Sequence, residues 1–221
     1  MTSDQERVRE AVVQMCRVIL GKEKEIREVM TAILANGHIL LEDIPGVGKT
    51  TLAAAFSRVL GLDYRRIQFT PDVMPSDLTR FSIYRREEER FVYQPGCVFC
   101  NLLLADEINR TSPKTQSALL EVMEERRVTV EGVTRERAGA GEGRRGRGTD
   151  DSGQPRAGSG NVLDRETLLD MQSAVHTVFI SDAVYEYILS LVTATRNHPY
   201  IERGASPRGT IAMVKMAKAS A

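Results

Sequence analysis

The sequence lacks tryptophan, has few other aromatic residues, and carries no net charge, because thirty basic side chains balance thirty acidic ones. This balance excludes a global field that would hold nucleic acid or an anionic membrane surface. No apolar run is long enough to cross a bilayer, and the N-terminal MTSDQERVRE is charged where a signal peptide has an apolar core. We therefore expect a cytoplasmic protein without a membrane partner, and a nucleic-acid partner is disfavoured.

Cysteine is also scarce, with Cys16, Cys97 and Cys100 as the three examples. The last two have the C-x-x-C spacing of a redox or zinc half-site. Zinc needs further ligands, however, and the three histidines are scattered along the chain. We interpret the pair as two incidental cysteines that flank a buried turn.

Residues 138–160, AGAGEGRRGRGTDDSGQPRAGSG, lack the large apolar side chains found elsewhere in the chain. Eight of these 23 residues are glycine and the only apolar side chains are alanines, so burial cannot offset the entropy of ordering the segment. We expect a flexible linker. An RNA-binding reading of RRGRG is disfavoured, because acidic residues offset its arginines and no aromatic side chain is present to stack on a base.

Hydrophobic periodicity predicts an α/β part before the linker and a helical part after it. Apolar residues recur at helical spacing over 5–20 and 22–36, with Gly37 expected to end the second helix. HILLEDIPGVGKTTLAAAFSRVLG then predicts a strand, a Pro/Gly-containing loop and a helix closed by Gly61. Further strands are expected at 64–69 and 101–105, and hairpins over FSIYRREEERFVYQPG and over 128–134, the second turning at Glu131-Gly132. Helices are expected at 113–126, 164–176 and 181–195 and from about 207 onward. Ser181 and Asp182 provide a capping signal for the helix at 181–195.

The stretch Gly46-Val47-Gly48-Lys49-Thr50 lies between a predicted strand and a predicted helix, the context in which a P-loop match is meaningful. Its glycines let backbone N–H groups curl around phosphate oxygens at a helix N-terminus. Lys49 would reach the β- and γ-phosphates of ATP, and the Thr50 hydroxyl would bind Mg²⁺. The full pattern has glycine at position 43, where this chain has Asp43.

A second acidic element follows the apolar run of residues 101–105. Asp106 and Glu107 stand at the C-terminal end of this predicted strand, where open α/β sheets place their ligands. Asp106 can hold the Mg²⁺ shell, and Glu107 can orient and deprotonate an attacking water. Together with the P-loop, this pair predicts a nucleotide-hydrolysis site.

At this level of detail the sequence resembles the MoxR-type AAA+ ATPases over about 1–137 and 161–221. The resemblance is carried by DIPGVGKTTLA, FTPDVMPSDLT, FCNLLLADEINRTSPKTQSALLEVMEE and GASPRG. Asp43 also occurs in this family's form of the loop. The resemblance implies an α/β P-loop NTPase core with a parallel sheet and a small all-helical lid domain.

The resemblance also extends the set of expected site residues. Ile19 and Gly21 would lie against the adenine, and Arg208 would be the lid arginine that touches the γ-phosphate. The expected catalytic residues are then Lys49, Glu107 and Arg208; the expected magnesium ligands are Thr50 and Asp106; and the expected nucleotide-binding residues are Ile19, Gly21, Asp43, Gly46, Val47, Gly48, Lys49, Thr50 and Thr51.

For the whole assembly, the resemblance implies a hexameric ring with ATP sites between subunits, which remodels a protein client as a chaperone does. Proteins with a von Willebrand factor A domain are frequent partners of the family. A DNA-handling motor is disfavoured by the neutral charge.

The linker stands where these ATPases have a strand ending in a polar sensor residue, an arginine finger and the strand that leads into the lid. We therefore expect an incomplete core over 1–137, the linker over 138–160 and a C-terminally short lid over 161–221. The linker is either a genuine tether or the scar of a deletion or a frame error. Without the sensor strand, the strand before the P-loop must pair directly with the Asp106 strand or leave backbone groups unmet. Two hypotheses follow: an ATPase with reduced turnover, or a nucleotide-binding remnant without hydrolysis.

Overall fold

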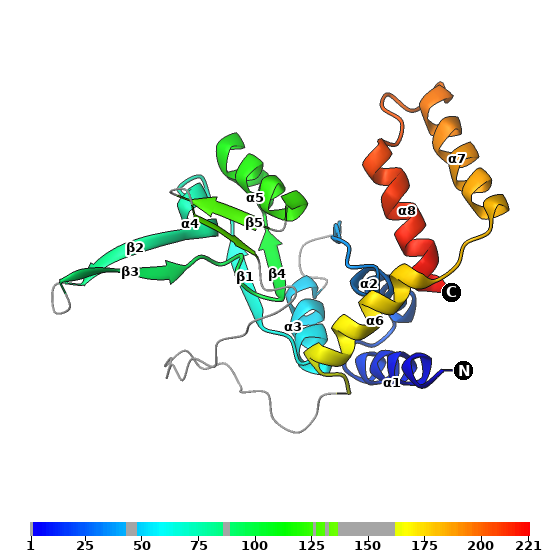
Figure 1. The fold of residues 1–221 in the computed structure, drawn as a ribbon, viewed down its shortest axis with the longest axis horizontal. Helices are drawn as coiled ribbons and strands as arrows, with labels where there is room; N and C mark the ends of the chain where they lie inside the picture. The colour runs from blue at the N-terminus through cyan, green and yellow to red at the C-terminus, as the bar shows by residue number, and fades with distance from the viewer. Residues whose placement is uncertain (1, 43–47, 86–88, 126, 131–132, 137–161) are drawn as a thin grey trace. The chain divides into compact units, whose positions relative to one another are not determined.

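The computed structural model describes residues 2–42, 48–85, 89–125, 127–130, 133–136 and 162–221. The predicted linker and the turn at Glu131-Gly132 lie outside these residues. The chain forms two units, one from residues 1–45 and 162–221 and the other from residues 46–161 (Figure 1). No single helix among the described residues is long and apolar enough to span a membrane, although one bent helix pair passes by length and composition alone.

The first unit is helical. The elements are α1 (Ser3–Val18), α2 (Glu23–Leu34), α6 (Arg165–Thr177), α7 (Asp182–Asn197) and α8 (Pro207–Ser220). Helix α2 packs against α1, α6 and α8, and its apolar face is buried as the periodicity predicted. Gln172 of α6 donates a hydrogen bond of 2.7 Å to the carbonyl of Ile33, one of the carbonyls in the last turn of α2.

The ends of these helices partly correct the sequence-based expectations. Asn36, not Gly37, takes the left-handed conformation after α2, with φ of 52°. Gly37 follows it and donates its N–H to the carbonyl of Ala32. Ser181 is the N-cap residue of α7, yet its side chain makes no capping hydrogen bond. Asp164 does cap α6, accepting from the N–H of Thr167 at 2.8 Å, and this hydrogen bond lowers the pKa of the carboxyl group.

The second unit holds the strands. Its elements are α3 (Lys49–Val59), β1 (Tyr64–Gln68), α4 (Pro75–Thr79), β2 (Arg80–Arg85), β3 (Arg90–Pro95), β4 (Leu102–Asp106), the 3₁₀ helix η1 (Ile108–Arg110), α5 (Pro113–Glu125), β5 (Arg127–Val130) and β6 (Val133–Glu136). Antiparallel pairing of β2 with β3 and of β5 with β6 confirms both predicted hairpins. Helix α3 ends as predicted, with Gly61 at φ of 58°.

Strands β1 and β4 pair in parallel, with Tyr64 opposite Leu102 and Gln68 opposite Asp106. Asp63 fixes the start of this pairing, since its carbonyl accepts the N–H groups of Asn101 and Leu102 at 3.0 and 2.9 Å. The pairing continues beyond β4, where the N–H of Phe69 donates to the carbonyl of Asp106 at 2.9 Å. The last residue of β4 is thereby held in the sheet.

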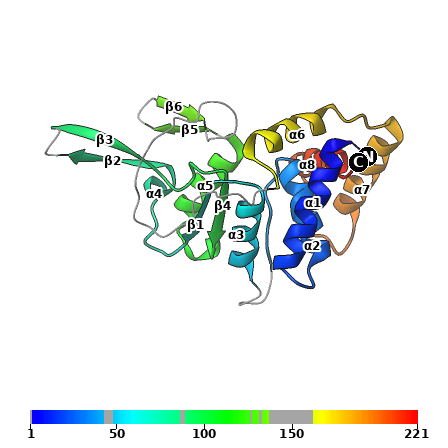
Figure 2. The ribbon, with the colours of Figure 1, turned by 90° about the horizontal axis from the view of Figure 1, so that it is seen from below.

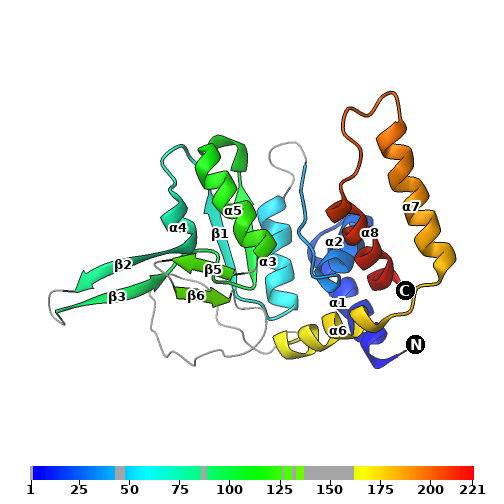
Figure 3. The ribbon, with the colours of Figure 1, turned by 45° about the horizontal axis from the view of Figure 1, so that its top comes forward.

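Helices cover both faces of this two-stranded sheet (Figures 2 and 3). On one face, Ile67, Leu103 and Ala105 pack against a core that includes Leu78 of α4 and Leu119 of α5. Helix α3 packs against β4 from the other side. Because side chains alternate between faces along a strand, α3 covers the face that carries Leu102, Leu104 and Asp106.

The prediction of a strand just before the P-loop is wrong. Residues 38–42 have no strand structure, and Ile39 and Leu40 are exposed, Leu40 by 78%. A central parallel strand is stable only between two neighbours that satisfy its backbone and cover its side chains. Among the described residues β4 pairs with β1 alone, so its other edge has no strand. Of the two outcomes expected for a missing sensor strand, direct pairing of residues 38–42 with β4 is not formed in the described part of the chain.

The edge of β4 that faces away from β1 leads to a prediction for amide hydrogen exchange. In the parallel pairing the N–H of Leu102 points to β1, and alternation assigns the N–H of Leu104 to β1 and those of Leu103 and Ala105 to the open edge. We expect the amides of Leu103 and Ala105 to exchange at least about tenfold faster than those of Leu102 and Leu104. Residue-resolved exchange by NMR measures this difference, and equal protection of all four amides would contradict the open edge.

Candidate functional site

Helix α3 begins after a glycine in the left-handed conformation. Gly48 precedes the helix with φ of 85°, a left-handed conformation that suits glycine. Among the described residues, the nearest atom to a Cβ added at Gly48 would be the Thr51 Cβ at 4.0 Å. Gly48 offers no side chain to cap the first N–H groups of α3, and a phosphate oxygen suits such groups. Asp43, Gly46 and Val47 lie outside the described residues.

The direction of α3 brings this turn to the acidic end of the sheet. A short connection, residues 60–63, joins the C-terminus of α3 to the start of β1. Because β1 and β4 are parallel, the N-terminus of α3 lies at the side where both strands end (Figure 3). Lys49 and Thr50 therefore start α3 at the end of the sheet that carries Asp106, over the same face.

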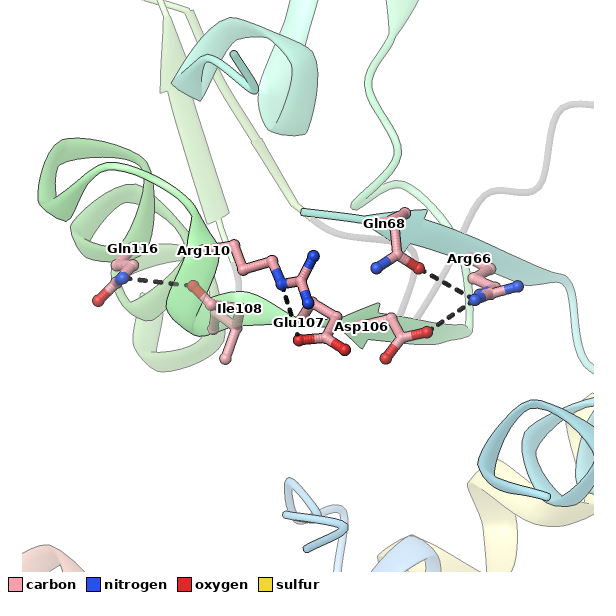
Figure 4. Close-up of polar contacts among 7 residues, drawn as sticks. All are labelled: Arg66, Gln68, Asp106, Glu107, Ile108, Arg110 and Gln116. Atoms are coloured by element: carbon pink, nitrogen blue, oxygen red, sulfur yellow. Dashed lines mark hydrogen bonds and ion pairs between the residues drawn. The ribbon is translucent and has the colours of Figure 1, made fainter. Parts of the chain in front are cut away.

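Asp106 is held by an arginine from the neighbouring strand. Arg66 Nη2 lies 2.7 Å from Asp106 Oδ2 and donates a second hydrogen bond to Gln68 Oε1 at 3.0 Å (Figure 4). The Asp106 side chain is 29% exposed, so this charge-assisted contact is only partly screened by water.

Tyr64 stands on the same face at the start of β1. Its hydroxyl oxygen is buried without a hydrogen-bond partner in the described part of the chain. Burial is the largest effect on this hydroxyl and raises its pKa. Two smaller effects oppose each other, because the charge of Arg66 lowers the pKa and the charge of Asp106 raises it. Tyr64 therefore stays neutral and adds no charge next to Asp106.

Glu107 has a strained backbone. Its φ and ψ of 57° and 39° place it in the left-handed region, where a side chain costs energy. The carboxylate is paired with Arg110, whose Nε lies 3.2 Å from Glu107 Oε2 (Figure 4). Gln116 of α5 fixes the turn by donating to the carbonyls of Ile108 and Thr111. This conformation turns the chain sharply after β4.

The oxygen atoms of Thr50 and Asp106 suit Mg²⁺, which binds one or two protein oxygens and keeps water and phosphate oxygens as its other ligands. Within the described ranges, no three side chains of His, Cys, Asp or Glu gather as they would at a structural metal site. The residues present therefore fit a magnesium ion that arrives with a nucleotide. Bound there, the ion would neutralise phosphate charge.

The remaining predicted residues belong to the first unit. Ile19 is the C-cap of α1 with its N–H bonded to the carbonyl of Met15, and Gly21 follows with φ of 73°. Arg208 is exposed in the first turn of α8, which Ser206 caps by accepting from the N–H of Gly209. Lys49 and Asp106 belong to the other unit.

Sequence reasoning missed Arg66, Gln68 and Arg110. The first two alternate with Ile67 along β1, so the period of two in YRRIQ places them on the face opposite the core. That pattern signals a polar face beside Asp106. Arg110 lies three residues after Glu107, a spacing that brings side chains together on one helical turn.

The two cysteines of the C-x-x-C pair are free thiols in the turn between β3 and β4. Cys100 is 1% exposed and its Sγ donates to the carbonyls of Cys97 and Leu102 at 3.3 and 3.4 Å. Burial raises the pKa of the Cys97 thiol. Both thiols therefore serve packing and backbone hydrogen bonding in this turn.

The strain at Glu107 can be measured by comparing Glu107→Gly with Glu107→Ala. Both variants lose the carboxylate and its pairing with Arg110, but only glycine adopts positive φ freely. We expect the glycine variant to exceed the alanine variant in free energy of unfolding by about 0.5–1 kcal/mol, after the entropy cost of glycine is subtracted. Urea denaturation measures both values. An alanine variant as stable as the glycine variant would contradict the strained conformation.

Two family models match the chain. Residues 38–139 match the ATPase family associated with various cellular activities (AAA), and residues 193–221 match the AAA lid domain. The crystal structure of a candidate ATPase from Cytophaga hutchinsonii superposes with a TM-score of 0.80 at 29% identity, covering 98% of this chain and 79% of that one.

Three relatives show how the chain differs in length. The uncharacterized protein YeaC of Bacillus subtilis is 40% identical over 248 residues, covering 96% of this chain and 78% of YeaC. Since this alignment is longer than the 221-residue chain, YeaC has residues without a counterpart here. The chaperone MoxR1 of Mycobacterium tuberculosis is 47% identical over 56% of this chain and 33% of its own, and MoxR of Methylorubrum extorquens is 38% identical over 53% and 35%.

The chain thus spans about a third of the length of these two MoxR proteins but most of YeaC. The AAA and lid matches, the parallel sheet and the relatives agree with the resemblance noted in the sequence. The chain belongs to the MoxR-type AAA+ ATPases.

Proposed function

We propose that the protein binds Mg-ATP at the site formed by the start of α3 and the end of β4, and hydrolyses it far more slowly than an intact relative. The observation that carries this proposal is the placement of Gly48, Lys49 and Thr50 at the end of the sheet where Asp106 stands. This placement pairs a phosphate-binding turn with an acidic magnesium ligand.

Each residue has a role in the proposed site. Backbone N–H groups at the start of α3, including those of Thr50 and Thr51, bind phosphate oxygens, and Lys49 neutralises the β- and γ-phosphates. Thr50 and Asp106 hold the magnesium shell. Glu107 orients and deprotonates the water that attacks the γ-phosphate. We also propose that Asp43, Gly46 and Val47, which lie outside the described residues, bind the nucleotide.

The first unit contributes at the two ends of the nucleotide in this proposal. Ile19 and Gly21 contact the adenine, and Arg208 contacts the γ-phosphate from the lid. The lid match over residues 193–221 supports the role of Arg208, which lies inside it.

Slow hydrolysis follows from the architecture of the sheet. Residues 38–42 lead into the P-loop without being part of a strand, so Lys49 lacks the strand support that fixes a P-loop relative to the acidic pair. A displacement of about 1 Å costs roughly a hundredfold in rate, and loss of an arginine finger costs ~10³ or more. YeaC has residues without a counterpart in this chain, which supports the proposal that the sensor strand and the arginine finger are missing here.

A second candidate is a nucleotide-binding remnant without turnover that serves only as an interaction module. The same residues 38–42 favour it, because exposed Ile39 and Leu40 indicate a core that has lost part of its sheet. ATP binding needs only the phosphate-binding turn and the magnesium ligands, so it survives in both candidates.

For the assembly, we propose the family's hexameric ring acting in the cytoplasm on a protein client, with a von Willebrand factor A-domain protein as partner. Exposed apolar side chains on and beside α7 support an interface on the helical unit; they include Phe179, Tyr187 and Tyr200. We also propose the division into a core over 1–137, a linker over 138–160 and a lid over 161–221. Helix α2 packs with the lid helices α6 and α8 and with α1, although α1 and α2 precede the P-loop.

The function is tested by steady-state hydrolysis of Mg-ATP by the full chain, with Lys49→Ala and Glu107→Gln as background variants. We expect turnover at least about 10³-fold below that of an intact relative, because the finger and the sensor strand are missing. Turnover that equals an intact relative and disappears in Glu107→Gln would contradict the proposal. Zero turnover above the background from folded protein would favour the remnant.

A further inference from the structure

The contact between Arg66 and Asp106 raises a question of charge at the proposed magnesium site. The carboxylate expected to hold the metal shell already accepts a hydrogen bond from a guanidinium at 2.7 Å. Arginine stays protonated at any working pH, so this positive charge is permanent. A divalent cation next to Asp106 would stand within a few ångströms of it.

The position of Arg66 follows from the register of the sheet. Gln68 is opposite Asp106 and Arg66 is opposite Leu104, so Arg66 reaches Asp106 along the diagonal between neighbouring strands. This arrangement is built into the β1–β4 pairing. The neighbouring Arg65 lies on the other face, where its Nη1 donates to the carbonyl of Gly96 at 3.3 Å.

Within the described residues Asp106 forms its ion pair with Arg66, whereas Arg110 is paired with Glu107. Arg66, in contrast, has a second acceptor in Gln68 Oε1 at 3.0 Å. The guanidinium therefore keeps a hydrogen bond if Asp106 turns to a metal.

We propose that Arg66 is a positioning residue that competes with Mg²⁺ for Asp106, holding the carboxylate until a metal–nucleotide complex displaces the guanidinium. This inference rests on the proposed function, because it takes Asp106 as part of the magnesium shell. In this proposal the Arg66 guanidinium lowers the affinity of the Asp106 carboxylate for a divalent cation.

The test is Mn²⁺ binding to the full chain in the presence of ATP, followed by EPR of the free ion, for wild type, Arg66→Ala and Arg66→Gln. We expect removal of the guanidinium to tighten Mn²⁺ binding by about twofold to fivefold, the range of a partly exposed ion pair. Binding of ATP measured in EDTA should stay within about twofold of wild type, because the phosphates contact α3. Arg65→Ala removes the same charge from the other face and should leave Mn²⁺ affinity unchanged.

Unchanged or weaker Mn²⁺ binding in the Arg66 variants would overturn the inference, since Arg66 would then be neutral to the metal or needed to orient Asp106. Circular dichroism checks folding, and Arg66→Gln, which keeps a long polar side chain, decides the matter if Arg66→Ala does not fold. An equal effect of Arg65→Ala would also overturn it, as a general effect of net charge. If wild type binds no ATP in EDTA or with Mn²⁺, the proposed function fails and the inference fails with it.

Discussion

The parallel pairing of β1 with β4 is the interaction on which the second unit depends. It holds Asp106 in the sheet through the N–H of Phe69, sets Arg66 beside the Asp106 carboxylate, and presents one face to α3 and the other to the core of α4 and α5. Every proposed chemical group of this unit is placed by that ladder, either directly or through α3.

The ladder is also where the unit is weakest. A sheet of two strands leaves β4 with an edge whose N–H and C=O groups need another partner, and parallel strands are normally buried on both sides. Residues 38–42 would be the natural neighbour by their apolar sequence, but they form no strand. This leaves binding and catalysis with different requirements, because phosphate binding depends on a local turn whereas hydrolysis depends on the relative positions of separate elements.

Much of this arrangement could be predicted from the sequence because it depends on local patterns. The apolar run of residues 101–105 specified a strand, although its residues are only half-buried, and the glycine at 61 specified a helix end, since each signal acts within one element. The prediction failed at residues 38–42, where an apolar run has the propensity of a strand but lacks the partner that would make it one. Whether a strand forms is decided by its neighbours, which lie far away in the sequence.

The same distinction explains the candidate site. The P-loop and the acidic pair were recognisable as motifs. The partner of Asp106 was not, because Arg66 comes from another strand, and neither was the left-handed backbone of Glu107. Register and φ are properties of the folded chain. The residues that tune a motif are therefore harder to predict than the motif itself.

The central claim is that a nucleotide site survives in a sheet that has lost a strand, and equilibrium titration of the full chain with ATP, with and without Mg²⁺, tests it most directly. The account predicts saturable binding that strengthens when Mg²⁺ is added and is lost in Lys49→Ala. A folded chain that binds no ATP under either condition would contradict it.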